Sequence, residues 1–253
     1  MLCIKNESAI KLMAESGKLL AACMEMLGEH IKPGMSTLEL DKLAHRYIIK
    51  HNAKPSFLGL YGFPATLCIS VNEQIIHGIP NEHKIIREGD IVSLDGGVLL
   101  NGFHSDMART FIVGETTEEK RLLVERTKQS FYEGMKYARA GNRISDISHG
   151  VEEYINQFGY GIVRDYTGHG VGRELHESPE IPNFGAPGHG PRIVNGMTIA
   201  IEPMINLGTH RVKVLSDGWT TVTADGKPSA HYENTVAVID GEPVILTDTD
   251  VHV

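Results

Sequence analysis

Apolar residues near the start of the chain recur at alternating steps of three and four positions. This spacing predicts an amphipathic helix, because such positions share one face of an α-helix. Asn6 stands just before the pattern and is a favourable N-cap residue. The apolar stripe consists of Ile10, Met13, Gly17, Leu20, Met24 and Leu27. We interpret it as a helix face that packs on the hydrophobic core.

Two further segments repeat one helical pattern at the same distance from a glycine. After Gly34, the apolar face consists of Thr37, Leu40, Leu43, Tyr47 and Ile48. After Gly141, it consists of Ile144, Ile147, Val151, Tyr154 and Ile155. Because the two patterns agree in register, they indicate an internal repeat.

Paired acidic residues mark the predicted strands of the two repeats. Two apolar runs each begin after a glycine and end in an acid six positions later. One extends from Gly89 to Asp95, and the other from Gly196 to Glu202. An acid also begins the last predicted strand of each repeat, at Asp106 and at Glu233. The acids therefore belong to the repeated framework and are not scattered surface charges.

The repeat predicts the fold class and the domain organisation. Two half-domains, about 1–120 and 121–253, would pack around a pseudo-twofold axis and share one curved antiparallel sheet covered by helices, an α+β arrangement. The junction between them reads as a short turn and a helix start, with Thr116 or Thr117 as N-cap. Nothing there resembles a linker, so we expect a single domain, 1–253.

Composition restricts the class of protein. The 253 residues are 41% hydrophobic and 22% charged, which fits a globular chain and excludes disordered and collagen-like classes. The net charge of -8 has the wrong sign for a partner that is DNA or an anionic bilayer. No apolar run is long enough to cross a membrane, and no signal-peptide pattern opens the chain.

The cysteines are too few and too widely spaced for a disulfide framework or a Cys-x-x-Cys metal site. They are Cys3, Cys23 and Cys68. A reducing compartment fits this use best, so we expect a cytoplasmic protein. A closed, duplicated domain with no long exposed apolar helix also predicts a monomer.

The predicted symmetry would bring four strand-borne acids together: Asp95, Asp106, Glu202 and Glu233. Uncompensated carboxylates in a core cost several kcal/mol each or become protonated, so we expect cations between them. Two divalent ions would balance the four carboxylates, and His169 would add an imidazole nitrogen. This donor set suits Mn²⁺, Fe²⁺, Co²⁺ or Zn²⁺ at a dinuclear site. For each acid alone, the alternative is a solvated residue at a strand end.

The segment from Tyr166 to Gly172, Tyr-Thr-Gly-His-Gly-Val-Gly, and the following His176 carry a family resemblance together with these acids. They resemble type I methionine aminopeptidases in their short bacterial form. The segments from Cys68 to Glu73 and from Ile76 to Pro80 fit as well, so the resemblance spans nearly the whole chain. It implies the "pita-bread" fold of the M24 metallopeptidases, a cytosolic location, and removal of the initiator methionine from proteins with a small second residue.

By this resemblance, five residues are metal ligands: Asp95, Asp106, His169, Glu202 and Glu233. Two ions would hold a bridging hydroxide that attacks the first peptide bond, and Glu202 would double as general base. His77, the repeat partner of His169, would lie near the scissile amide nitrogen. His176 would hydrogen-bond the carbonyl oxygen. The alternative for both histidines is a structural role, which is the more common one for a lone histidine.

The resemblance also implies an apolar pocket for the methionine side chain, formed by Phe57, Phe63, Cys68, Leu175 and Trp219. Core packing is the alternative for each of them. Some positions depart from the family pattern: Phe57, Tyr61, Phe63 and Leu175 replace its usual residues, and two glycines follow Asp95. Leu175 loosens one wall while Phe57 fills another, so the sequence leaves the strictness of the methionine preference open.

Two other functions compete with this one. Xaa-Pro aminopeptidases and dipeptidases share the fold and its five ligands, and the run from Asp106 to Phe111 has some of their character. Those enzymes generally carry a separate N-terminal domain, for which the residues before Asp95 leave no room. A non-catalytic binding protein of the same fold would not need all five ligands. The expected partners are the N-termini of nascent polypeptides, and transient association with ribosomes stays open.

Overall fold

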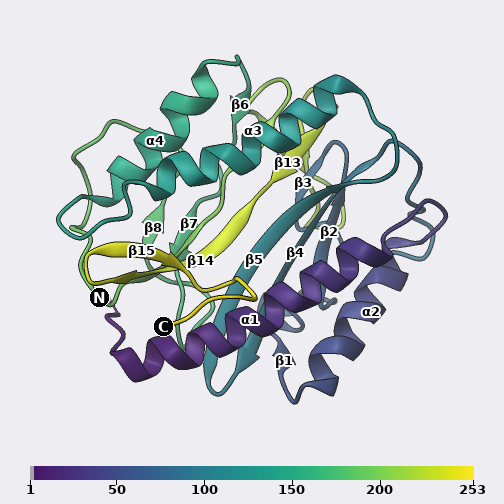
Figure 1. Cartoon of the computed structure of the whole chain (residues 1–253). Helices are drawn as coiled ribbons and strands as arrows, with labels where there is room; N and C mark the ends of the chain where they lie inside the picture. Colours follow the sequence, from purple (N-terminus) through teal and green to yellow (C-terminus); the bar gives the residue numbers. More distant parts are fainter. Residues whose placement is uncertain (1–2) are drawn as a thin grey trace.

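The computed structural model describes residues 3–253. Within them, four α-helices lie over a central sheet as two pairs, one from each half of the chain (Figure 1). The helices are α1 (Glu7–His30), α2 (Thr37–Lys50), α3 (Glu118–Met135) and α4 (Ile144–Asn156), with a short 3-10 helix, η1 (Leu60–Gly62). α1 packs on α2, and α3 packs on α4.

The largest sheet is antiparallel and runs in the order β1-β4-β5-β14-β9-β7-β8, with β2 beside β4 and β15 beside β14. Its strands are β1 (Lys54–Pro55), β2 (Leu67–Val71), β4 (Ile91–Leu100), β5 (Phe103–Ile112), β7 (Gly168–Gly170), β8 (Glu177–Ile181), β9 (Thr198–Ile201), β14 (Glu233–Ile239) and β15 (Glu242–Ile245). Two small sheets have the orders β13-β10-β6 and β11-β12-β3. Their strands are β3 (Gln74–Ile76), β6 (Gly161–Ile162), β10 (Met204–Asn206), β11 (Val212–Val214), β12 (Thr221–Thr223) and β13 (Ser229–His231).

The arrangement of the sheet is similar on the two sides of its central strand pair. β5 pairs with β14, β4 lies outside β5, and β9 lies outside β14. A helix pair accompanies each side (Figure 1). We propose that the chain is one domain, 1–253, built from two related halves, about 1–120 and 121–253. The support for this proposal is the matching strand order around β5 and β14.

The predicted helices are confirmed. The Asn6 side chain caps α1 by accepting the Ala9 N–H at 2.9 Å, and every residue of the predicted stripe is buried. Thr117 caps α3, and Glu118 lies in the first turn, where an acid interacts favourably with the helix dipole. Gly17 of the stripe is needed because a Cβ there would come 2.1 Å from the backbone oxygen of Leu246.

The predicted strand ends are wrong in the first half and right in the second. Asp95 lies in the middle of β4, and Asp106 is the fourth residue of β5. These strands extend to a tight turn at 101–102 because β1 and β2 pair with the outer edge of β4. In the second half, Glu202 directly follows β9 and Glu233 begins β14.

The apolar core lies where the helices meet the sheet. Its largest cluster joins Leu20 and Leu27 of α1 to Leu40 of α2 and to Leu94 and Val98 of β4. A second cluster links α3 and α4 to β9 and β14. The framework that carries the acids is therefore packed from behind in both halves. In residues 3–253, no helix is both long enough and apolar enough to span a membrane.

Candidate metal centre and adjoining pocket

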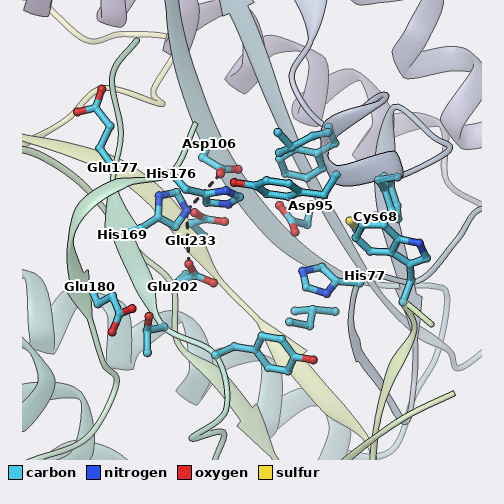
Figure 2. A pocket seen from close by; sticks show the side chains of 18 of the residues that line it. Cys68, His77, Asp95, Asp106, His169, His176, Glu177, Glu180, Glu202 and Glu233 are labelled. Carbon is cyan, nitrogen blue, oxygen red and sulfur yellow. Dashed lines mark ion pairs between the residues drawn. The ribbon is translucent and has the colours of Figure 1, made fainter. Parts of the chain in front are cut away.

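Antiparallel pairing places the four predicted acids on one face of the sheet. Asp95 of β4 and Glu233 of β14 both lie opposite Ala108 of β5, one from each side. Asp106 is two residues before Ala108, and residues two apart on a strand share a face. Glu202 follows β9, which pairs with the other edge of β14. Figure 2 shows the four carboxylates gathered around one centre.

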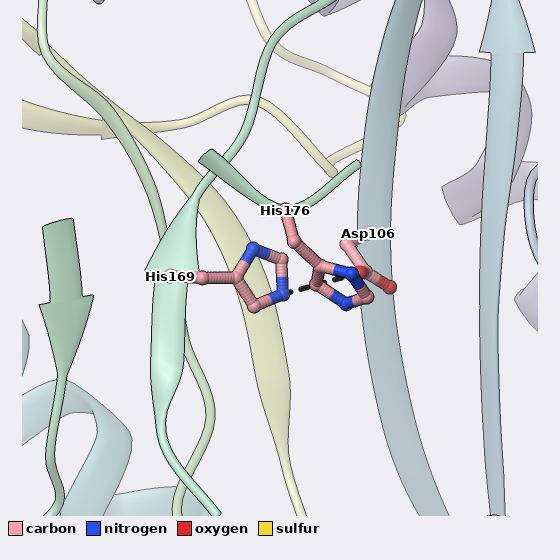
Figure 3. A group of neighbouring side chains, drawn as sticks. All are labelled: Asp106, His169 and His176. Atoms are coloured by element: carbon pink, nitrogen blue, oxygen red, sulfur yellow. Dashed lines mark ion pairs between the residues drawn. The ribbon is translucent and has the colours of Figure 1, made fainter. Parts of the chain in front are cut away.

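His169 of β7 completes this group. Its Nε2 lies 3.6 Å from Asp106 Oδ2 (Figure 3) and 3.7 Å from Glu202 Oε1. Its Nδ1 donates a hydrogen bond to the Gly170 oxygen at 2.8 Å, which fixes the tautomer that leaves Nε2 available as a ligand. Burial lowers the pKa of His169, so the ring is neutral. The structure therefore brings all five predicted ligands together.

Three sets of potential ligand atoms have all members within 4.8 Å of one another. They are Asp106 with His169 and His176; His169 with Glu202 and Glu233; and Asp95 with Asp106 and Glu233. Because the sets share members, they form one continuous cluster. We call the five predicted ligands among these residues the ligand cluster; His176 lies directly beside it.

The electrostatics of the ligand cluster fit bound cations. Asp95 Oδ1 and Glu233 Oε1 are buried without a hydrogen-bond partner. Within residues 3–253, no lysine or arginine forms an ion pair with any of the four carboxylates. Burial, reinforced by neighbouring carboxylates, raises the pKa of Asp95, Glu202 and Glu233 well above their ordinary values. Burial raises the pKa of Asp106 to about 8. Divalent cations would remove this conflict and satisfy the orphaned oxygens.

Glycines on both sides of His169 allow β7 to lie close to its neighbours. A Cβ at Gly168 would come 2.3 Å from the Ala200 oxygen, and one at Gly170 would come 2.6 Å from the Ser178 oxygen. Only glycine fits between β8 and β9 at these positions. The Gly-x-Gly pattern thus sets the depth at which His169 enters the cluster.

The two other predicted histidines occupy different places. The His176 ring centroid lies 4.4 Å from that of His169, and a ring nitrogen of His176 lies within 4.8 Å of a carboxylate oxygen of Asp106. His77 lies across the pocket (Figure 2), with its ring edge-on to Tyr166 at 5.4 Å. Burial lowers the pKa of both His77 and His176 to about 4. His77 has a positive φ of 58°, an uncommon backbone state that is frequent at functional sites.

A cavity of about 500 Å³ opens beside the ligand cluster. Four predicted pocket residues line it: Phe57, Phe63, Cys68 and Trp219. Phe63 and Trp219 meet edge to face with their ring centroids 5.1 Å apart. Leu175 packs in the same apolar cluster, behind the lining residues. The structure therefore gathers the predicted pocket, with its apolar wall next to the carboxylates.

His231 is a residue of the site that sequence reasoning missed. It is 1% exposed, and its Nε2 lies 3.8 Å from Glu202 Oε2 and 3.9 Å from Glu233 Oε2. Neither ring nitrogen has a hydrogen-bond partner in the described chain. The sequence signal that could have identified His231 is its position two residues before Glu233. It ends β13, the strand that precedes β14.

Arg109 holds the junction of β5 and β14 beneath the cluster. Its Nη1 donates to the backbone carbonyl oxygens of Glu233 at 2.6 Å and Ala108 at 2.8 Å, and its Nη2 donates to Asn234 Oδ1 at 2.7 Å. The guanidinium also lies 4.1 Å above the centre of the Tyr232 ring. It therefore fixes the backbone that carries Glu233 without pairing with the ligand carboxylate itself.

Lys5 and Glu177 form a buried ion pair next to His176. Their side chains are only 7% and 9% exposed. The Lys5 backbone N–H donates to the Gly196 oxygen at 2.8 Å, and Glu177 also accepts the Glu174 N–H at 3.3 Å. In Figure 2 the Glu177 carboxylate points away from the ligand cluster. This pair ties the segment before α1 to the segment that carries His176.

The chain is similar to known peptidases along nearly all of its length. Residues 11–240 match metallopeptidase family M24. The methionine aminopeptidase of Clostridium perfringens is 55% identical over 98% of this chain and 99% of its own length. The crystal structure of methionine aminopeptidase from Thermotoga maritima is 42% identical, with a TM-score of 0.96 over 98% of this chain and 100% of that chain. Prolidase from Pyrococcus furiosus is 25% identical, with a TM-score of 0.78 over 98% of this chain and 66% of that chain.

These similarities confirm several predictions made from the sequence. They confirm the α+β pita-bread fold, with its curled antiparallel sheet and covering helices, and the resemblance to methionine aminopeptidases. They also show that the protein is a hydrolase of a family that uses divalent metal. Because the family match covers 230 residues, 11–240, the chain belongs to metallopeptidase family M24.

Proposed function

We propose that this protein is an aminopeptidase that removes the N-terminal methionine from polypeptides with a small second residue. The observation that carries the proposal is the position of the ligand cluster at one wall of an open pocket whose other wall is apolar. The pocket suits an unbranched thioether. With a methionine side chain bound there, the first peptide bond of the substrate would lie at the ligand cluster. The names of the relatives from Clostridium perfringens and Thermotoga maritima support the same function.

We also propose that the ligand cluster holds two divalent ions, drawn from Mn²⁺, Fe²⁺, Co²⁺ and Zn²⁺. The support is the charge. Asp95, Asp106 and Glu233 are buried and Glu202 is only 12% exposed, so four clustered carboxylates need about four positive charges, and the His169 imidazole is a borderline ligand. When bound, such ions lower the pKa of water and polarise the scissile carbonyl. Asp106 and Glu233 each occur in two of the ligand sets, so they are the carboxylates best placed to contact both ions.

The remaining roles belong to side chains around the scissile bond. Glu202 lines the cavity at the edge of the cluster and would accept the proton of the attacking water and pass it to the leaving amine. His176 would hydrogen-bond the carbonyl oxygen from one side. His77, on the opposite wall, would face the amide nitrogen. Both rings are held largely neutral by burial, so each can donate one N–H and accept one proton.

The walls of the proposed pocket are supported in different ways. Phe63 and Trp219 brace each other edge to face, whereas Leu175 supports the wall from behind. Phe57 and Cys68 complete the lining. We propose that these side chains bind the methionine side chain, and that substrates are the N-termini of nascent polypeptides, met in the cytoplasm by a monomeric enzyme. The cysteine usage and the net charge support this setting.

The decisive experiment measures which amino acid is released, and with which metal. The chain is stripped with chelator, reconstituted separately with Mn²⁺, Co²⁺, Fe²⁺ or Zn²⁺, and assayed on Met-Ala-Ser, Leu-Ala-Ser and Ala-Pro-Ala. We expect metal-dependent release of methionine alone. Preferential cleavage of Ala-Pro-Ala would replace this function by an Xaa-Pro peptidase, and no release with any metal would favour a binding protein.

A further inference from the structure

Tyr61 is the most exposed large apolar side chain in the part of the chain that the structure describes, at 78%. It nevertheless lines the mouth of the pocket, while Phe57 and Phe63 of the same loop are buried. A ring left in water gains little from the hydrophobic effect. Packing of the folded chain therefore does not explain an aromatic residue at this position.

The backbone at Tyr61 is also unfavourable. Its φ of 51° and ψ of 17° lie in the left-handed region, which bulky residues rarely adopt. Gly59 and Gly62, with φ of 85° and 90°, flank it, and the loop is closed by the Gly59 N–H donating to the Phe63 oxygen at 2.8 Å. Strained residues that a rigid loop holds in place cluster at binding sites.

The ring continues a series of side chains that leads outward from the ligand cluster. The His169 and His176 ring centroids are 4.4 Å apart. Tyr61 stacks on His176 with 10° between the ring planes and 6.2 Å between the centroids. An extended peptide advances about 3.3 Å per residue. The separation of Tyr61 from His176 is therefore about the length of two residues of an extended peptide, and Tyr61 is the outer of the two rings, 78% exposed.

We propose that Tyr61 is the binding surface for the third residue of the substrate and that it favours apolar and aromatic side chains there. The inference rests on the proposed function, because methionine in the pocket and its peptide bond at the cluster direct the third residue to the mouth. The flat, solvent-facing ring can stack on such a side chain. An exposed surface also accepts many sequences, as a processing enzyme requires.

The test compares three amides: Met-Ala-NH2, Met-Ala-Gly-NH2 and Met-Ala-Phe-NH2. The wild-type chain should have the highest kcat/KM on the phenylalanine peptide. In Tyr61→Asn, the ratio of kcat/KM between the phenylalanine peptide and Met-Ala-NH2 should fall roughly 3- to 10-fold, mainly through KM, which is the range of one aromatic contact. Asn is well tolerated at positive φ, so the loop keeps its shape.

Two further variants separate a substrate contact from a structural effect. Tyr61→Phe keeps the ring and should keep the ratio. Tyr137→Asn removes another exposed tyrosine, which lies beyond the end of α3 and outside the pocket lining, and should also keep it. Equal loss on all three amides in Tyr61→Asn would show an effect through His176 and overturn the inference, as would an unchanged ratio. If the wild-type chain released no methionine from any amide, the proposed function would fall as well.

Discussion

The strongest test of the ligand cluster is the pH dependence of stability in metal-free Asp106→Asn. Asp106 is 3% exposed, and burial raises its pKa from 3.8 to about 8. Between these values the folded chain binds a proton that the unfolded chain releases. The stability that this proton confers is complete below about pH 4 and is lost as the pH rises through about 8. Asn has nearly the same shape, cannot ionise, and can still accept the Met107 N–H, which Asp106 Oδ1 accepts at 3.1 Å.

Three histidines of the site act in the opposite direction at lower pH. Burial lowers the pKa of His77 and His176 to about 4 and that of His231 to about 3. Their unfolded forms therefore bind protons that the folded forms do not, and stability rises with pH up to about 6.5. Above that value these histidines are neutral in both states. Between about pH 6.5 and 8, the change in stability therefore reports on the carboxyl groups and not on these histidines.

The size of the effect follows from proton linkage. One proton held only by the folded chain changes the free energy of unfolding by about 1.4 kcal/mol per pH unit. For Asp106 this amounts to roughly 2 kcal/mol over the interval, or about 4–8 °C in Tm for a chain of this size. Metal-free wild-type protein should lose at least this much between pH 6.5 and 8. Metal-free Asp106→Asn should lose less stability over the same interval. The Asp106 charge is absent in this variant, which also relieves its repulsion of Asp95, Glu202 and Glu233.

Thermal melts of chelator-treated protein at four pH values provide the assay. Asp225→Asn is the matched control, since backbone hydrogen bonds lower the pKa of that exposed carboxyl, and it should leave the slope unchanged. Added Mn²⁺ should raise the wild-type Tm more at pH 8 than at pH 6.5, because metal competes with protons for the ligands, and should have little effect on Asp106→Asn. A metal-free wild-type Tm that stays level or rises from pH 6.5 to 8 would refute the reasoning.

Three other variants test individual residues. Glu202→Gln should fold normally and hydrolyse Met-Ala-Ser at least about 100-fold more slowly, since the proton acceptor is lost; near-normal turnover would contradict its role. His77→Ala should lower kcat while the metal content, measured by mass spectrometry, stays constant, because this ring lies outside the ligand sets; loss of metal would place it among the ligands. Lys5→Met should cost about 3 kcal/mol in urea unfolding by leaving Glu177 buried and unpaired. Lys11→Met, from an exposed pair, should cost less than about 1 kcal/mol, and equal costs would show that burial of the Lys5 pair is unimportant.

Local sequence signals were sufficient for the helices and for the acids and the histidine that the structure brings together. The stripe that begins at Ile10 and the cap at Asn6 depend on neighbours within one or two turns, so they could be read directly. The acids could be found because a repeated position is informative even when each residue alone is ambiguous. Asp95 and Asp106 were identified in this way although their places within the strands were wrong.

Tertiary structure decided what depends on pairing between distant segments. The length of β4 is set by β1 and β2 on its outer edge, so no local pattern ended it at Asp95. His231 and the Lys5–Glu177 pair reach the site through contacts between segments far apart in the chain. The sequence determined which side chains were candidates for the chemistry, because residue type and repeat spacing are local properties. Only the fold decided their distances, burial and pKa values, because these arise from the groups packed around each side chain.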